Sequence, residues 1–315
     1  MDFKGLKIGV LGGGISGERE ISLLSANGVY KSLVACGLDV VFIDIITSDE
    51  EEVKNLLLAH SLDVAFIALH GAFGEDGKIQ SILESIGLSY TGSAPKASLL
   101  AMDKILSKKV FQNNNINTPD FFVCSDSKNI PKNITYPVVV KPHFCGSSLG
   151  VTIVKDKGSL EEAIKKALSF SPKVILEKYI EGRELTVGIL DDEALAVVEI
   201  IPKKGTFDFE AKYTKGKTSF VVPAELDKKV YKQTQATGLL AHRALGCRGF
   251  CRVDIRLGKD NIPYVLEVNS IPGLTNKSLL PLAAKACGYD FNKLVLKVIE
   301  LALHGKKEAQ KIKTV

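Results

Sequence analysis

The sequence predicts an α/β protein whose C-terminal part is α+β, and two observations carry this prediction. The first is that short apolar strands alternate with helix-like segments near the N-terminus, at 7–11, 16–36, 39–46, 51–60 and 64–69. This order is typical of a small parallel sheet with helices on its faces. The second is that the apolar segments at 250–257 and 262–269 follow one another across a short polar turn, which predicts an antiparallel hairpin.

The remaining elements divide the chain into three predicted domains, 1–94, 95–180 and 181–315. The spacing of apolar residues predicts the elements of the second unit at 96–112 (helix), 137–142 (strand), 151–154 (strand), 161–169 (helix) and 173–179 (strand). In the third unit it predicts strands within 185–201 and helices at 228–245, from 278 and at 291–303. A connection as long and polar as 203–219 is usually functional in a compact domain, so we expect a functional loop there.

Composition excludes several classes of protein. The 315 residues are 45% hydrophobic and 24% charged, which is typical of a globular chain and not of a disordered or fibrous one. No apolar run approaches the roughly 18 residues that a membrane helix needs. The net charge of +5 is scattered, so we expect neither nucleic acid nor a membrane as partner. Six dispersed cysteines and an N-terminus without signal or transit features predict a cytoplasmic protein with reduced thiols.

The predicted hairpin at 250–269 carries the strongest chemical signal. Arg252 and Asp254 lie two residues apart on one strand, as do Glu267 and Asn269 on the next, so each pair shares a face. Two carboxylates and an amide oxygen are the hard ligands that Mg²⁺ takes together with phosphate oxygens. The spacing alone is equally compatible with a solvated face held by cross-strand ion pairs.

A lysine followed by a Gly/Ser loop is the second signal. Lys141 ends an apolar strand directly before the loop 146–150, whose backbone N–H groups are suited to holding phosphate. Lys104, on the preceding helix, is a second candidate for phosphate, although a lone lysine is more often a solvated surface residue. The loop lacks the Gly-Lys-Ser/Thr ending of a Walker A motif.

The N-terminal glycines allow a different interpretation. Gly12-x-Gly14-x-x-Gly17 follows a strand and opens a helix, and Asp44 ends the next strand, which together match a dinucleotide-binding fingerprint. On this reading the protein is an NAD(P)-dependent oxidoreductase. Glu18 argues against it, because a carboxylate in the first turn would repel a pyrophosphate. Glu18 instead stabilises the helix dipole or holds a substrate ammonium.

Two further positions have the character of site residues. Ser278 is a preferred N-cap, and the helix that it opens is a ready site for a carboxylate, although ordinary capping is the more common role of such a serine. His70 ends a strand and begins a Gly-rich loop, where functional side chains are common.

Taken in order, these segments resemble the D-alanine–D-alanine ligase family of the ATP-grasp superfamily over essentially the whole chain. The segments that carry the resemblance are 12–22, 70–77, 90–93, 102–104, 140–142, 146–148, 177–179, 210–213, 252–254, 267–269, and 272–273 with 278–279. Each is weak alone, whereas the ordered set is specific. The resemblance implies a three-domain ATP-grasp fold with an N-terminal Rossmann-like domain.

The resemblance also implies roles for residues of this chain. ATP phosphates would contact Lys104, Lys141, Ser148 and Lys212; the adenine would lie at Glu177, Lys178 and Tyr179; and Glu184 would bind the ribose. Two Mg²⁺ or Mn²⁺ ions would lie on Asp254, Glu267 and Asn269. Catalysis would depend on Glu18, Ser147, Tyr213 and Arg252, and substrate would be bound by His70, Gly273, Ser278 and Leu279.

The activity that the resemblance implies is the ATP-dependent condensation of two D-alanines for peptidoglycan synthesis. A carboxylate attacks the γ-phosphate, an acyl phosphate forms, and the second amine displaces phosphate. The implied assembly is a homodimer. Another carboxylate–amine ligase of the superfamily with a different acceptor is the alternative. Because the acyl phosphate must be kept from water, the resemblance also implies a mobile lid, which we expect at about 203–219. We expect Tyr213 in this lid to favour D-alanine over D-lactate as the second substrate, and turnover of both substrates across pH would test this.

Overall fold

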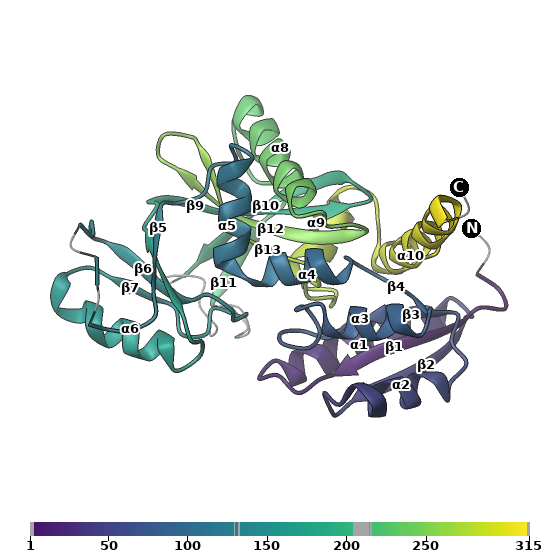
Figure 1. Cartoon of the computed structure of the whole chain (residues 1–315). Helices are drawn as coiled ribbons and strands as arrows, with labels where there is room; N and C mark the ends of the chain where they lie inside the picture. The colour runs from purple at the N-terminus through teal and green to yellow at the C-terminus, as the bar shows by residue number, and fades with distance from the viewer. Residues whose placement is uncertain (1–2, 129, 132, 204–213, 215, 314–315) are drawn as a thin grey trace.

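The structure is a computed structural model that describes residues 3–128, 130–131, 133–203, 214 and 216–313. It contains three sheets, one parallel and two antiparallel, which occur in the order in which the sequence predicts them. Figure 1 shows the parallel sheet at one end of the molecule, the large antiparallel sheet at its centre and the small antiparallel sheet at the other side. The predicted fold class, including its α+β C-terminal part, is therefore confirmed.

The N-terminal sheet has the strand order β2-β1-β3-β4, with all neighbours parallel. Its strands are β1 (Lys7–Gly13), β2 (Asp39–Ile45), β3 (Val64–Ile67) and β4 (Ser89–Tyr90), and its helices are α1 (Arg19–Ala35), α2 (Glu50–Leu58) and α3 (Lys78–Ser85). Helices cover both faces, because alternate residues of β3 enter different cores: Phe66 packs with α1, and Ile67 packs with α2 and α3. The carboxyl ends of these strands lead into the loops that carry Glu18 and His70.

The small sheet has the order β5-β8-β6-β7 and is antiparallel. It consists of β5 (Phe121–Cys124), β6 (Val138–Pro142), β7 (Thr152–Val154) and β8 (Val174–Lys178), with a short 3-10 turn (Lys157–Ser159) before α6 (Leu160–Leu168). The apolar side of α6 covers one face of the sheet. The loop 146–150 joins β6 to β7, as the sequence predicts.

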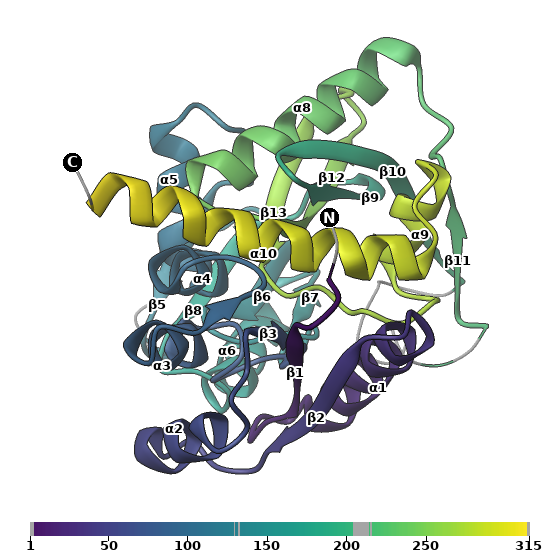
Figure 2. The ribbon, with the colours of Figure 1, turned by 90° about the vertical axis from the view of Figure 1, so that its right-hand side faces the viewer.

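The large sheet has the order β11-β10-β9-β12-β13. Its strands are β9 (Gly182–Leu190), β10 (Glu193–Pro202), β11 (Thr218–Val221), β12 (Phe250–Gly258) and β13 (Pro263–Asn269). The helices that follow the chain around it are α8 (Lys228–Ala244), α9 (Leu279–Ala286) and α10 (Phe291–Lys313). α10 lies between this part and the N-terminal sheet in Figure 2, and Leu294 and Val298 share a core with Ile8 and Phe66.

Two helical details differ from the sequence prediction. The single helix expected at 96–112 is two helices, α4 (Pro95–Met102) and α5 (Lys104–Asn113), because Asp103 is extended and its carboxylate caps α5 by accepting from the N–H groups of Ile105 and Leu106. The first helix begins at Arg19 and not at residue 16: its N-cap is Glu18, and the Ser16 hydroxyl donates to the carbonyl of His70 (2.8 Å) and accepts from the N–H of Glu18 (3.2 Å).

Packing crosses the predicted boundaries between domains. Ala97, Ala101 and Phe111 of α4 and α5 share a core with the large sheet, although they belong to the second predicted unit. The division at 94/95 and 180/181 stays a prediction. Within the described residues, no helix combines the length and the apolar character that crossing a bilayer requires.

Candidate active site

The site is built on the β12–β13 hairpin. Its register places Asp254 opposite Glu267 and Arg252 opposite Asn269, so the four polar side chains share one face as predicted. Val253, Ile255, Val265 and Val268 are buried on the other face. A register shift after Asp254 accommodates the extra residue on β13, which keeps both sets on their own sides.

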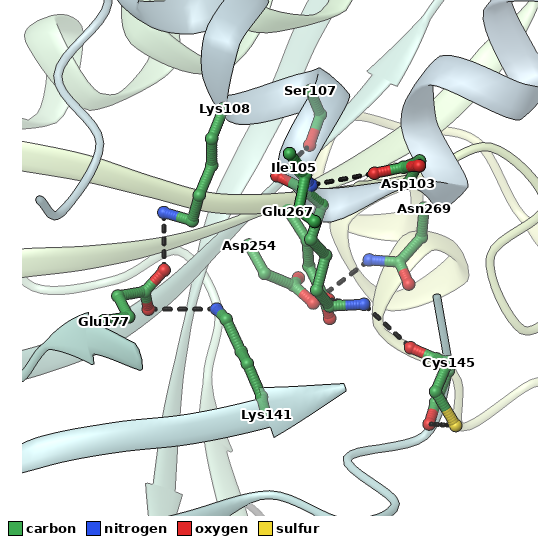
Figure 3. Close-up of polar contacts among 12 residues, drawn as sticks. Asp103, Ile105, Ser107, Lys108, Lys141, Cys145, Glu177, Asp254, Glu267 and Asn269 are labelled. Atoms are coloured by element: carbon green, nitrogen blue, oxygen red, sulfur yellow. Dashed lines mark hydrogen bonds and ion pairs between the residues drawn. The ribbon is translucent and has the colours of Figure 1, made fainter. Parts of the chain in front are cut away.

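Asp254 is the centre of this face. Its Oδ1 accepts hydrogen bonds from Thr186 Oγ1 (2.7 Å) and Arg252 Nε (2.9 Å), and its Oδ2 accepts from Arg252 Nη2 (3.0 Å) and Asn269 Nδ2 (3.1 Å). These contacts fix the orientation of the carboxylate before any ligand arrives. Asn269 donates with its amide nitrogen, and its amide oxygen points away from Asp254 (Figure 3).

The donor set on this face fits a divalent cation that also binds phosphate. Glu267 faces Lys104, whose Nζ lies 3.0 Å from Glu267 Oε2 and 2.7 Å from the carbonyl oxygen of Cys145. No group of three or more His, Cys, Asp or Glu side chains gathers for a metal within the described parts of the chain. Two carboxylates and an amide are instead the partial shell that Mg²⁺ completes with phosphate oxygens and water.

A cavity opens between this face and the small sheet. Nearly all residues expected to bind ATP and metal line it: Lys104, Lys141, Ser148, Glu177, Lys178, Tyr179, Glu184, Asp254 and Glu267. They come from α5, the small sheet and the large sheet, so the cavity exists only because these elements meet. Lys212, expected at the phosphates, lies outside the described residues.

Lysines and a buried carboxylate line one part of this cavity. Glu177 Oε1 lies 2.9 Å from Lys141 Nζ, and its Oε2 lies 2.5 Å from Lys108 Nζ (Figure 3). Burial would raise the pKa of Glu177, but the two ammonium groups outweigh it and lower that pKa. For Lys104, burial acts to lower the pKa, and the charge of Glu267 raises it overall. The site therefore presents fixed positive charge to an anionic ligand.

Arg256 organises the part of the cavity that contains Tyr179 and Glu184. This guanidinium donates to Glu184 Oε2 (3.0 Å), the hydroxyl of Tyr179 (3.2 Å) and the carbonyl of Ile180 (3.2 Å). It also lies over the Tyr179 ring, 5.7 Å from the centroid. Arg256 thus holds in place the two side chains expected at ribose and adenine.

A second cavity lies between the N-terminal loops and the large sheet. The residues expected to bind and activate the amino-acid substrates line it together: Glu18, His70, Ser147, Arg252, Gly273, Ser278 and Leu279. Thr214, Gly216, Thr218 and Phe220, from the end of the expected lid, line it as well. Tyr213 and residues 204–212 of that lid lie outside the described residues.

Glu18 is held tightly between two loops. The Ser147 hydroxyl donates to Glu18 Oε1, joining α1 to the 146–150 loop. A Cβ atom at Gly71 or at Gly146 would lie 2.6 Å from Glu18 Oε2, so both glycines allow the loops to close around the carboxylate. Gly71 also has φ of +73°, which favours glycine.

His70 is buried beside Glu18. Its Nδ1 lies 3.0 Å from the carbonyl of Ile271, which can only accept, so Nδ1 carries the proton and Nε2 accepts from the Ser25 hydroxyl (2.8 Å). Burial lowers the pKa of His70 to about 4. The ring is therefore neutral near pH 7 and ties α1 to the segment after β13.

The first turn of α9 faces the same cavity. The Ser278 hydroxyl contacts Thr275, accepting from its N–H (3.1 Å) and lying 2.9 Å from its Oγ1, rather than bonding an N–H of its own helix. Among the described residues, the Ser278 side chain therefore caps no N–H group of α9, and the start of a helix favours an anion.

The glycine motif of β1 is used structurally. Arg19 forms a two-pronged ion pair with Asp44 (2.9 and 2.7 Å) and also donates to the carbonyl of Gly14 (3.3 Å). These side chains fill the turn, since a Cβ at Gly13 would lie 2.0 Å from Asp44. A Cβ at Gly17 would meet nothing within 4 Å, so this glycine does not serve the close helix–strand packing of a dinucleotide fold. The dinucleotide interpretation is therefore wrong.

Sequence reasoning missed four polar residues at or next to the cavities. Glu75 lines the second cavity. It belongs to the 70–77 motif, but no charge pattern in the sequence singles it out. Arg256 continues the alternation of Arg252 and Asp254 on one strand face, which was a usable signal. Lys108 follows Lys104 by one helical turn. Thr186 comes from a neighbouring strand, so spacing could not have revealed it.

Comparisons with known proteins agree with this geometry. Residues 45–93 match the model of the D-ala D-ala ligase N-terminus, and residues 110–300 match that of the D-ala D-ala ligase C-terminus. A D-alanine–D-alanine ligase of Geotalea uraniireducens is 43% identical over 304 residues, which cover 96% of this chain and 97% of the relative.

Solved structures give the same result. A D-alanine–D-alanine ligase from Bacillus anthracis complexed with ATP is 34% identical, with a TM-score of 0.85 over 97% of this chain and 100% of that one. The VanG D-Ala:D-Ser ligase of Enterococcus faecalis is 31% identical, with a TM-score of 0.80 over 95% and 100%. Identity and coverage at this level leave one conclusion: the chain belongs to the D-alanine–D-alanine ligase family, and its fold is the ATP-grasp fold of that family.

Proposed function

We propose that this protein joins two D-alanines into D-alanyl-D-alanine at the expense of ATP, giving ADP and phosphate, as a step in peptidoglycan precursor synthesis. One observation carries the proposal. A small third cavity shares Lys104 and Glu267 with the nucleotide cavity, and Glu75 and Asn269 with the substrate cavity. A γ-phosphate and a carboxylate bound in the two cavities would meet at the hairpin face.

ATP would occupy the first cavity. Lys104, Lys141, Ser148 and Lys212 would bind phosphates, Glu177, Lys178 and Tyr179 would line the adenine end, and Glu184 would bind the ribose. The position of Lys104 supports this orientation, because this lysine lines both the nucleotide cavity and the small cavity at the hairpin face. The ATP complex of the Bacillus anthracis relative supports the choice of nucleotide.

Asp254, Glu267 and Asn269 would hold Mg²⁺ or Mn²⁺, as two ions. Such ions supply charge neutralisation to the phosphates and to the transferred phosphoryl group. The chain's own contribution is to fix Asp254 through Thr186 and Arg252 and to hold Glu267 beside Lys104.

The amino acids would occupy the second cavity. Glu18, oriented by Ser147 and Tyr213, would bind the ammonium of the first D-alanine, with His70 beside its carboxylate. The carboxylate of the second D-alanine would lie at the start of α9, on Ser278 and Leu279. Arg252, together with the backbone of Gly273, would stabilise the oxyanion that forms when the second amine attacks.

The arrangement suits an acyl phosphate route. The first carboxylate attacks the γ-phosphorus and ADP leaves; the second amine then attacks the acyl carbon, the C–O bond to phosphate breaks, and the amine loses a proton. Two anions must be brought together, which fixed lysines and Arg252 make possible. A lid over 203–219 would exclude water from the acyl phosphate.

The test of this function is a panel of acceptors with ATP and Mg²⁺. We expect phosphate release that requires D-alanine and is absent with L-alanine, and a dipeptide product. The VanG relative supports one second candidate, a ligase that takes a different acceptor such as D-serine. Faster turnover of D-alanine with D-serine or D-lactate than with D-alanine alone would establish that candidate instead.

The oligomeric state and the cellular location complete the proposal. The family supports a homodimer, which light scattering of the purified chain tests directly, with a monomer mass as the contrary result. It also supports work in the cytoplasm, where ATP is available. Fractionation of the cells that make the protein tests this placement.

A further inference from the structure

A fully buried lysine next to the nucleotide cavity has no role in the reaction as described so far. Lys108 lies one turn after Lys104 on α5 and has 0% of its surface exposed. Lys104 reaches the hairpin face, whereas Lys108 reaches away from it toward the small sheet (Figure 3). Burying an ammonium is costly unless its hydrogen bonds and charge are matched, so this position requires an explanation.

The surroundings of Lys108 are matched to an ammonium. Its Nζ lies 2.5 Å from Glu177 Oε2, 2.6 Å from Thr118 Oγ1 and 3.5 Å from the carbonyl of Pro119. The Thr118 hydroxyl donates to the carbonyl of Val265 (2.8 Å), so its oxygen is an acceptor for Lys108. The ammonium thus donates hydrogen bonds to Thr118 and Pro119 and forms an ion pair with Glu177, and the Phe121 ring lies 5.5 Å away.

Glu177 divides its two oxygens between two lysines. Oε2 binds Lys108, and Oε1 binds Lys141, which lines the nucleotide cavity. The carboxylate and both lysines are buried. Any phosphate that draws Lys141 toward itself weakens the Lys141–Glu177 contact. Without a second cation, that movement would leave a buried carboxylate uncompensated, which is strongly unfavourable.

We propose that Lys108 is a positioning residue that neutralises Glu177 and thereby releases Lys141 to bind the phosphates of ATP. This inference rests on the proposed function, because it requires ATP in the first cavity. Lys108 acts through Glu177 and Lys141 and touches no substrate. Burial lowers the pKa of Lys108 to about 8, and the charge of Glu177 counteracts this, so the ammonium is retained near pH 7. Lys141 and Glu267 are the other charged groups that face it.

The test compares ATP affinity in four forms of the full chain: wild type, Lys108→Met, Glu177→Gln and the double variant. In Lys108→Met, only Lys141 remains to neutralise Glu177, so we expect the Kd for ATP to rise about tenfold to hundredfold, the size of one lost charge-assisted contact. The KM for D-alanine should stay within about twofold. The double variant removes the carboxylate as well and should return the Kd for ATP close to that of Glu177→Gln. Lys109→Met, at the exposed neighbouring lysine, is the matched control.

Three results would overturn the inference. An unchanged Kd for ATP in Lys108→Met would show that Lys141 does not depend on Lys108. A loss that persists in the double variant relative to Glu177→Gln would show that Lys108 does not act through Glu177; this comparison holds even if Lys108→Met alone does not fold. Equal rises in the ATP Kd and the D-alanine KM would indicate a general structural defect. Failure of the proposed function is separate, because the wild type itself would then show no D-alanine-dependent phosphate release.

Discussion

Replacing Glu267 by Gln tests the hairpin face most sharply. The substitution keeps the size of the side chain and removes one of the two carboxylates on this face. A bound metal ion contributes several kcal/mol to the stabilisation of charge in the transition state. If loss of this ligand removes about 4 kcal/mol of that contribution, turnover falls by roughly a thousandfold.

The cost to folding should be much smaller. Glu267 pairs with Lys104 at 3.0 Å, and the two side chains are 24% and 9% exposed. Breaking a fully buried pair costs about 3–5 kcal/mol, and partial exposure reduces this to about 1–3 kcal/mol. Lys104 also keeps its hydrogen bond to the carbonyl of Cys145 (2.7 Å). Activity and stability should therefore separate clearly.

The assay is D-alanine-dependent phosphate release under saturating Mg-ATP, with thermal unfolding measured on the same preparation. Glu161→Gln is the control, because Glu161 also pairs with a lysine (2.7 Å to Lys165) but is 55% exposed and lies on α6. We expect that variant to match the wild type in both measurements. Turnover of Glu267→Gln within a few-fold of wild type would refute the metal assignment.

Two further predictions concern the substrate cavity and pH. Gly146→Ala should raise the KM for D-alanine more than tenfold with little change in the KM for ATP, because the new Cβ would lie 2.6 Å from Glu18 Oε2. Gly17→Ala is the control and should change neither KM, because a Cβ there meets nothing within 4 Å. Steady-state kinetics of both variants measure these effects. Burial lowers the pKa of His70 and of His242 to about 4, below the value of 6.5 in the unfolded chain. The unfolded chain therefore takes up these protons first, so stability is full above about pH 6.5 and falls toward pH 4, by about 2 kcal/mol per histidine at pH 5. Urea unfolding at pH 7 and 5 measures this loss, and a loss that is unchanged in His242→Gln would contradict it.

The face of the hairpin could be predicted from the sequence because side chains along a strand alternate between its two faces. Arg252 and Asp254 had to share a face, and the register confirms that Glu267 and Asn269 lie opposite them. Contacts between segments that are distant in the sequence could not be predicted from local spacing. Glu18 and Ser147 are 129 residues apart, and only the family resemblance brought them together before the structure did.

Helical spacing and glycine motifs were less reliable guides. Lys104 and Lys108 lie on the same side of α5, yet spacing does not tell which lysine reaches a cavity and which is enclosed among Glu177 and Thr118. The Gly12–Gly17 motif matches a dinucleotide fingerprint in the spacing of its glycines but not in the packing around them. The Arg19–Asp44 pair, which fills that turn, is a tertiary contact that no local pattern specifies.

The most direct test of the central claim uses D-alanine labelled with ¹⁸O in its carboxylate. If the carboxylate attacks the γ-phosphate and the second amine then breaks the acyl C–O bond, a labelled oxygen leaves with the phosphate. We predict ¹⁸O in the released phosphate together with D-alanyl-D-alanine, and neither product with L-alanine. Unlabelled phosphate alongside the dipeptide, or ATP cleavage without any dipeptide, would contradict the account.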